Sequence, residues 1–92
     1  MDNYKIFETH EFQKNIEKIS QRESELIKKK LRGYIYPQLK DEPHYGNNIK
    51  KLVDYKPETW RYRTGKYRLF YSINETEKTV YILTIDLRKD AY

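Results

Sequence analysis

WRYRTGKYRLFY, at residues 60–71, is the stretch that decides the fold. It contains two β-prone runs joined by Gly65-Lys66. A Gly-X pair is a favoured two-residue hairpin loop because glycine tolerates the positive φ of a type II′ turn. With this loop, Arg63 lies directly opposite Arg68. Opposed like charges destabilise a sheet, so the segment predicts a hairpin whose electrostatic penalty needs an explanation.

The predicted hairpin has two faces of different chemistry, because side chains alternate along each strand. The apolar face carries Trp60, Tyr62, Leu69 and Tyr71. The other face, here called the arginine face, carries Arg61, Arg63, Arg68 and Phe70. Two interpretations remain open. One is a solvated outer face whose arginine stems cover Phe70 and pair with Asp86; the other is a site for phosphates with bases stacked nearby.

Two helices are expected before the hairpin. Tyr4–Glu8 is short and β-prone, and Thr9 then caps a first helix. Ser20 begins a second helix through a capping box, and Pro37 predicts the end of this helix near Tyr36. The tight connection between the helices predicts that they pack as an antiparallel pair.

Further strands are expected in the second half of the chain. Residues 38–59 are irregular apart from a short strand-like piece at 49–53, whereas residues 79–87, TVYILTIDL, are strongly β-prone. The resulting β-α-α-β-β-β order predicts an α+β fold, with two antiparallel helices on one face of a mostly antiparallel sheet. Residues 1–92 are expected to form one domain.

The register of the last strand decides which of its residues join the arginine face. We expect Ile73 to pair with Thr79, which directs Tyr81 and Leu83 to the core. In the same register Arg68 faces Thr84. The arginine face then also receives Asp86 and Arg88, and its floor is formed by Phe70 and Ile82.

Composition restricts the class of protein. The 92 residues include no cysteine, which excludes disulfides and thiolate metal sites. The net charge of +5 fits a surface for nucleic acid or an acidic protein, or else scattered positive charge without such a partner. No signal-peptide pattern and no membrane-spanning apolar run is present, so a cytoplasmic location is expected. His10 and His44 lack a metal-ligand pattern, and no phosphate-binding glycine motif or Ser-His-Asp or Cys-His set is found.

Several segments resemble one known family. IKKL at 49–52, WRYRTGKYRLFYSI at 60–73, TVYILTI at 79–85 and LRKDAY at 87–92 are similar to the RelE/ParE superfamily of bacterial and archaeal toxins. The resemblance covers nearly the whole chain, and its most specific parts are the basic-X-basic hairpin and the C-terminal Arg-X-X-X-Tyr. It implies a RelE-like fold and a toxin of a type II toxin–antitoxin system. The RelE branch is implied to cleave mRNA in the ribosomal A site without a metal or other cofactor.

The resemblance also implies site residues. Carried over by position, the catalytic candidates are Arg61, Arg63, Arg68, Arg88 and Tyr92. The candidates for RNA binding are Lys50, Lys51 and Phe70, the two lysines because they adjoin the hairpin in sequence. No metal ligands are expected.

The chain departs from the best-known RelE pattern, which has lysines where Arg61 and Arg63 stand. Cleavage by a 2′-hydroxyl needs a proton acceptor, charge stabilisation at phosphorus and a proton for the 5′-oxygen. Arginine supplies only the stabilisation, because it does not lose its proton near neutral pH. Tyr92, Lys50, Lys51 or ribosomal RNA must supply the rest, and the sequence does not choose among them.

Functions from two classes therefore remain. One is a ribosome-dependent endoribonuclease. The other is a non-enzymatic gyrase inhibitor of the ParE kind, or an inactive module that only pairs with its antitoxin. The implied partners are a RelB-like antitoxin and the ribosome with mRNA in its A site, with no membrane association. The toxin–antitoxin complex is implied to bind operator DNA through the antitoxin.

Overall fold

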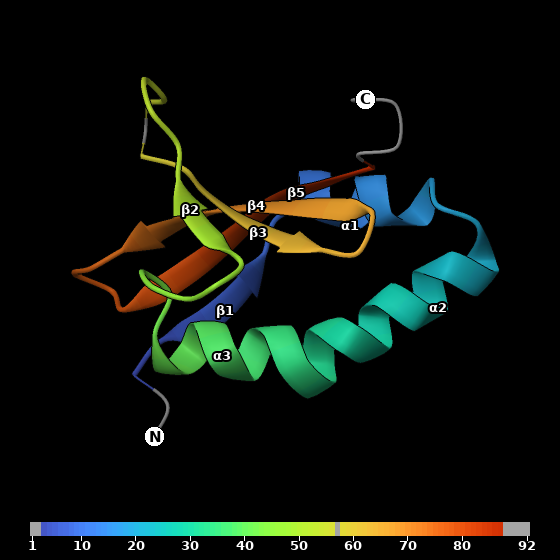
Figure 1. Ribbon diagram of the computed structural model, residues 1–92, viewed down its shortest axis with the longest axis horizontal. Helices are drawn as coiled ribbons and strands as arrows, with labels where there is room; N and C mark the ends of the chain where they lie inside the picture. Colours follow the sequence, from blue (N-terminus) through green and yellow to red (C-terminus); the bar gives the residue numbers. More distant parts are fainter. Residues whose placement is uncertain (1–2, 57, 88–92) are drawn as a thin grey trace.

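The computed structural model describes residues 3–56 and 58–87, in which a helical layer packs on one face of a five-stranded sheet (Figure 1). The strands are β1 (Lys5–Glu8), β2 (Ile49–Lys51), β3 (Trp60–Thr64), β4 (Tyr67–Asn74) and β5 (Thr79–Leu87). The helical segments are α1 (His10–Glu17), α2 (Gln21–Lys30), the π-helical η1 (Leu31–Ile35) and α3 (Tyr36–Asp41). None of the helices in these residues is long and apolar enough to cross a membrane.

The sheet has the strand order β1-β5-β4-β3-β2. β1 pairs with β5 in parallel, whereas the other neighbouring strands pair antiparallel. This arrangement confirms the predicted α+β fold with helices on one face of a mostly antiparallel sheet. The strand-like piece expected at 49–53 is shorter than predicted, because only Ile49–Lys51 pairs with β3.

The β3–β4 hairpin has the predicted register. Gly65 has a φ of 56°, in the left-handed region that glycine enters without steric penalty. Arg63 lies opposite Arg68, and Arg61 lies opposite Phe70. The arginine face and the apolar face of this hairpin are therefore as expected.

The β4–β5 pairing differs from the prediction. Its register shifts between Phe70, which lies opposite Thr84, and Tyr71, which lies opposite Ile82. Leu83 is thus one extra residue in β5, a β-bulge that reverses which residues of the strand face the core. The prediction that Tyr81 and Leu83 enter the core is wrong, and so is the placement of Ile82 on the arginine face: Ile82 is fully buried in the core.

The turn between β4 and β5 explains part of this difference. Asn74 pairs with Thr79, so the loop has one residue fewer than expected. The Asn74 Oδ1 atom accepts a hydrogen bond of 2.9 Å from the Glu77 backbone N–H, and Lys78 has a φ of 53°. This side-chain bond closes the loop early. The shorter loop and the bulge at Leu83 each shift the pairing by one residue in the same direction, so Arg68 lies opposite Asp86 rather than Thr84.

Thr9 fixes the bulge to the start of α1. Its Oγ1 lies 2.7 Å from the Ile82 carbonyl oxygen and 3.1 Å from that of Leu83, and its backbone N–H donates to Ile82 at 3.1 Å. The same Oγ1 accepts a 3.2 Å bond from the Phe12 N–H, as an N-cap does. One threonine therefore begins the helix and holds the irregular backbone of β5.

The second helix does not end near Tyr36, as Pro37 predicted, but continues to Asp41. η1 lies directly before the proline, and the Tyr36 N–H bonds to the Leu31 carbonyl, five residues back. A proline ring in a regular helix clashes with the carbonyl four residues earlier. The wider π turn relieves that clash, so the helix passes through the proline.

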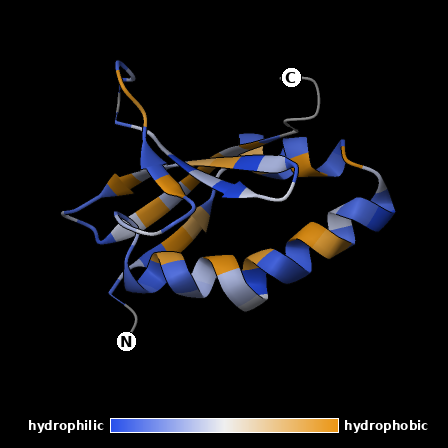
Figure 2. Ribbon diagram, in the orientation of Figure 1, coloured by the Kyte–Doolittle hydropathy of each residue, from blue (hydrophilic) through white to orange (hydrophobic). Residues whose placement is uncertain are grey.

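The wide turn also keeps the apolar stripe of this helix on the sheet. The stripe is formed by Ile27, Leu31, Ile35 and Leu39, all nearly inaccessible to solvent. In a regular α-helix, residues four apart differ in direction by about 40° around the helix axis. After three such steps Leu39 would point away from the sheet. Figure 2 shows the resulting hydrophobic bands along the helix, separated by hydrophilic ones.

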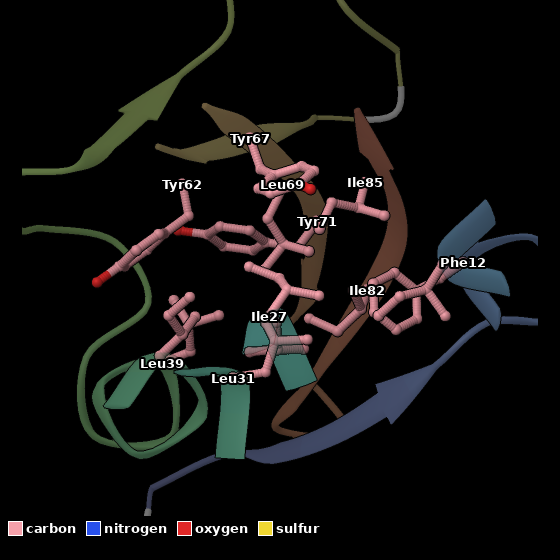
Figure 3. Packing of buried hydrophobic residues seen from close by; sticks show 13 residues of the cluster. Phe12, Ile27, Leu31, Leu39, Tyr62, Tyr67, Leu69, Tyr71, Ile82 and Ile85 are labelled. Carbon is pink, nitrogen blue, oxygen red and sulfur yellow. The ribbon is translucent and has the colours of Figure 1, made fainter. Parts of the chain in front are cut away.

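The core lies between this stripe and the apolar face of the sheet, with Phe12 closing one end (Figure 3). Three tyrosines of the sheet take part. Tyr62 donates to Gln38 at 2.7 Å, Tyr71 donates to the Pro43 carbonyl at 2.6 Å, and Tyr67 donates to Glu23. Each ring is buried while its hydroxyl has a partner in the helical layer or the loop after it.

The double role of Thr9 gives the first prediction. Thr9→Ala loses the cap and the bonds to the bulge, so we expect a destabilisation of about 2 kcal/mol or more, against about 1 kcal/mol for a cap alone. Ser20→Ala is the matched control, because Ser20 is exposed and caps α2 through the Glu23 N–H at 3.3 Å. Urea unfolding measures both, and hydrogen exchange of β5 should accelerate only in Thr9→Ala. Equal losses would show that Thr9 is merely a cap.

Candidate nucleic-acid interface

A row of charged residues crosses three strands on the arginine face. Arg63 of β3 lies opposite Arg68 of β4, and on its other side Arg68 lies opposite Asp86 of β5. The Arg68 Nη2 atom is 3.4 Å from Asp86 Oδ2. Arg68 thus has a like charge on one side and an opposite charge on the other, whereas the sequence placed Thr84 in the position of Asp86.

A second row runs beside the first across four strands. Lys50 of β2 lies opposite Arg61 of β3, Arg61 lies opposite Phe70 of β4, and Phe70 lies opposite Thr84 of β5. The Asn15 side chain of α1 donates to the Thr84 hydroxyl. The two rows bring four basic side chains and one aromatic ring onto one face of the sheet.

Arg61 and Arg68 lie close to the sheet, whereas Arg63 is exposed. The Arg68 guanidinium carbon is 6.0 Å from the centre of the Phe70 ring, and its side chain is 30% exposed. The Nε atoms of Arg61 and Arg68 are buried and have no hydrogen-bond acceptor among the described residues. Unpaired buried donors cost stability, so a ligand group or a water that accepted a hydrogen bond from them would stabilise this face.

Lys51 is separated from Lys50 by the alternation of the strand. It lies opposite Trp60, on the apolar side of the hairpin, with its Nζ 5.8 Å from the Trp60 ring centre. The same Nζ donates to Glu58 at 3.1 Å. Of the two lysines proposed for RNA binding, only Lys50 therefore shares a face with the arginines.

Two further candidates, Arg88 and Tyr92, lie outside the described residues. The remaining members of the predicted catalytic set, Arg61, Arg63 and Arg68, are brought together as expected. The register correction adds Asp86 directly beside Arg68. The sequence already placed Asp86 on this face, but its position opposite Arg68 depends on the bulge.

The three core tyrosines, Tyr62, Tyr67 and Tyr71, do not supply an easily formed phenolate. Burial, followed by the hydrogen bond to Glu23, raises the pKa of Tyr67 to about 12. Burial also raises the pKa values of Tyr62 and Tyr71. These hydroxyls are hydrogen-bond donors of the core. Among residues 3–56 and 58–87, no group of three His, Asp or Glu side chains is arranged to hold a metal ion.

A second polar cluster lies at the opposite end of the hairpin and was missed by the sequence analysis. His44 lies between two carboxylates, with Nδ1 2.8 Å from Glu42 Oε2 and Nε2 2.6 Å from Glu75 Oε2. Its ring makes edge contacts with Trp60 and Tyr4, at 5.4 and 6.0 Å between centres. The cluster ties the loop after α3 to the β4–β5 turn, so we interpret it as structural.

Comparison with known proteins now identifies the family. Residues 6–92 match the model of the family described as "ParE toxin of type II toxin-antitoxin system, parDE". The chain belongs to this ParE toxin family. It is therefore a toxin of a type II toxin–antitoxin system. A search of curated proteins finds no match.

Solved structures similar to this ParE-family chain are RelE toxins and their complexes. The RelBE2 toxin–antitoxin complex from Mycobacterium tuberculosis contains a chain that is 28% identical, with a TM-score of 0.70, over 94% of this chain and 99% of that one. The archaeal RelE–RelB complex from Pyrococcus horikoshii gives 21% identity and a TM-score of 0.70 over 96% and 98%. Isolated E. coli RelE gives 22% and 0.67 over 97% and 90%. These likenesses support the RelE-like fold.

Arg68 lies between a like charge and an opposite charge, so substitutions of Arg63 and of Arg68 should have opposite effects on the stability of this ParE-family chain. Arg63→Thr removes the like charge and should raise the free energy of unfolding by a few tenths of a kcal/mol, about the scale of a cross-strand pair. Arg68→Thr should lower it, because the contacts with Asp86 and Phe70 are lost. Urea unfolding at low and high salt tests this, since screening should reduce the gain in Arg63→Thr. A gain in Arg68→Thr would show that Asp86 does not offset the repulsion.

The His44 cluster predicts a pH-dependent stability. Burial disfavours the imidazolium, but the hydrogen bonds and charges of Glu42 and Glu75 outweigh it and raise the pKa of His44. A raised folded-state pKa stabilises the fold below the unfolded pKa of about 6.5, and this contribution is lost as the pH rises through the folded value. His44→Gln should therefore destabilise the protein more at pH about 6 than at pH about 9. His10→Gln is the control, because His10 is exposed. A loss of stability in His44→Gln that is the same at both pH values would contradict the charged pairing.

Proposed function

We propose that this toxin is a metal-independent endoribonuclease that cleaves mRNA in the ribosomal A site. The observation that carries the proposal is the arginine face: Lys50, Arg61, Arg63 and Arg68 lie together in two adjacent rows with Phe70 among them. Guanidinium groups bind phosphate oxygens with charge-assisted bonds, and an aromatic ring offers a stacking surface for a base. A solvated outer face needs neither buried Nε atoms without acceptors nor two arginines directly opposed.

In the proposed reaction, the arginines act on charge. Attack of a 2′-hydroxyl on the neighbouring phosphorus builds negative charge on the phosphoryl oxygens. Arg61, Arg63 and Arg68 stabilise this charge best if they are already in place, because a preorganised donor needs no reorganisation during the reaction. The products are a 2′,3′-cyclic phosphate and a free 5′-hydroxyl. If the arginines alone stabilise the phosphorus, a chelator added to a preformed ribosome–message complex should leave cleavage intact.

A cognate antitoxin is the second part of the proposal. The complexes of the M. tuberculosis and P. horikoshii structures pair a toxin of this fold with an antitoxin. A basic face on a protein of net charge +5 favours an acidic, amphipathic segment that folds as it binds. Such a segment would cover the arginines and exclude RNA from them. Co-purification with the product of an adjacent reading frame tests this part.

One observation favours a different function. The matching family is named for ParE, and the ParE kind of toxin inhibits DNA gyrase without cleaving RNA. This alternative needs only the fold, whereas the endoribonuclease also accounts for the composition of the arginine face. Supercoiling by gyrase in the presence of the toxin, measured beside mRNA cleavage, separates the two.

The test compares neighbouring residues on opposite faces. In a reconstituted ribosome complex, Arg68→Ala should lower the cleavage rate by about 10²–10³-fold, the loss expected for one donor that stabilises a developing charge. Lys50→Ala should lower it on the order of tenfold, as for a charge-assisted contact with phosphate. Lys51→Ala should have a smaller effect, because its side chain lies on the side of Trp60. Mapping of the mRNA ends gives the rate and the positions of the cuts.

Three results would contradict the proposal. Intact mRNA together with inhibited gyrase would support the ParE alternative. Equal effects of Lys50→Ala and Lys51→Ala would show that the arginine face is not the side that meets the message. Products with 5′-phosphate ends would require an activated water in place of the 2′-hydroxyl.

A further inference from the structure

The arginines of the arginine face do not supply the proton acceptor that the proposed reaction needs. A guanidinium does not give up its proton near neutral pH and so does not act as a base. The described tyrosines of the core, such as Tyr67, have raised pKa values, which disfavours a phenolate. The second row, which contains Lys50 and Thr84, offers an amine and a hydroxyl but no carboxylate.

The register of β5 supplies a carboxylate at this place. Asp86 lies opposite Arg68 on the arginine face, and its side chain is 61% exposed. Its Oδ2 is 3.4 Å from Arg68 Nη2, at the long end of hydrogen-bonding distance, so the carboxylate is oriented without being fully occupied. We propose that Asp86 accepts the proton of the attacking 2′-hydroxyl while Arg68 holds the phosphate; this assignment rests on the proposed endoribonuclease function.

The step balances with water as the only further reactant. The 2′-hydroxyl loses its proton to the Asp86 carboxylate, and its oxygen forms a bond to phosphorus. The bond from phosphorus to the 5′-oxygen breaks, and the electron pair of that bond goes to the 5′-oxygen, which takes a proton from water. The cyclic phosphate and the 5′-hydroxyl leave, and Asp86 returns its proton to the solvent.

The geometry favours a catalytic over a purely structural role for Asp86. An exposed salt bridge contributes little to stability. Arg68 also already contacts the Phe70 ring. A carboxylate one row from Arg61 and directly beside Arg68 lies next to any phosphate that these arginines bind. By contrast, the exposed Glu58 pairs with Lys51 on the other side of the hairpin.

The test uses the full-length toxin on a ribosome complex with a defined message. Asp86→Asn keeps the size of the side chain and an acceptor for Arg68 but removes the base. Cleavage should fall by about 10²–10⁴-fold, the range for general acid–base groups. The acidic limb of the pH–rate profile, along which the wild-type rate rises as the base loses its proton, should disappear. Binding to a message with a 2′-deoxy substitution at the cut site should persist.

Controls separate a base from a charge partner. Asp86→Ala should regain part of its rate when formate is added, because a small carboxylate can occupy the vacated space. Glu58→Gln, which also removes an exposed carboxylate paired with a basic residue, should keep the wild-type rate and pH profile. Far-UV circular dichroism and urea unfolding confirm that each variant is folded.

The outcomes distinguish the assignment from the function on which it rests. If the wild type cleaves and Asp86→Asn keeps its rate and pH profile, Asp86 is not the base, although the endoribonuclease stands. If Asp86→Asn cleaves faster and binds RNA more tightly, Asp86 only neutralises Arg68, and the assignment is again overturned. If the wild type itself leaves the message intact, the proposed function and the assignment both fail.

Discussion

The extra residue in β5 is the constraint on which the rest of the structure depends. Because Leu83 has no partner in β4, the strand changes face at that point. Ile82 enters the core beneath the helices, while Asp86 reaches the outer face beside Arg68. In a regular strand, side chains alternate strictly, so Ile82 and Asp86 would lie on the same face. Such a strand could not place Ile82 in the core and Asp86 on the outer face.

The bulge needs support because it leaves backbone groups without ladder partners. Thr9 provides it by bonding to the carbonyls of Ile82 and Leu83 while it caps α1. The start of the helical layer and the irregular point of the sheet are therefore one structural unit. We therefore expect a substitution of Thr9 to affect the arginine face through the register of β5.

The arginine face shows how stability and chemistry are balanced in this sheet. Arg63 opposite Arg68 is unfavourable, and the Nε atoms of Arg61 and Arg68 lack acceptors within the described residues. Asp86 offsets part of this cost without covering the guanidinium. A bound phosphate would supply acceptors for these Nε atoms and negative charge between the arginines. The proposed ligand would thus offset the remaining cost in stability.

Local rules in the sequence predicted most of the fold. Gly65, Thr9 and Ser20 act through a turn and two caps, whose effects extend over only a few residues. Two features, the passage of the helix through Pro37 and the bulge at Leu83, could not be predicted, because they depend on tertiary packing. Pro37 is tolerated only because a π turn precedes it.

The site shows the same limit. The arginines were predicted from alternation within one hairpin. The position of Asp86 depends on a loop one residue shorter than expected and on a bulge stabilised by Thr9, which lies far away in the sequence. The separation of Lys50 from Lys51 required knowing that β2 pairs with β3.

The register of β5 against β4 is the measurement that tests this account most directly. Cross-strand nuclear Overhauser effects between backbone protons distinguish the two pairings, because directly opposed residues lie about 4.5–5.5 Å apart at Cα. The account predicts contacts of Arg68 with Asp86 and of Tyr71 with Ile82. Contacts of Arg68 with Thr84 and of Tyr71 with Tyr81 would show a regular strand without the bulge, and would contradict both the core and the site described above.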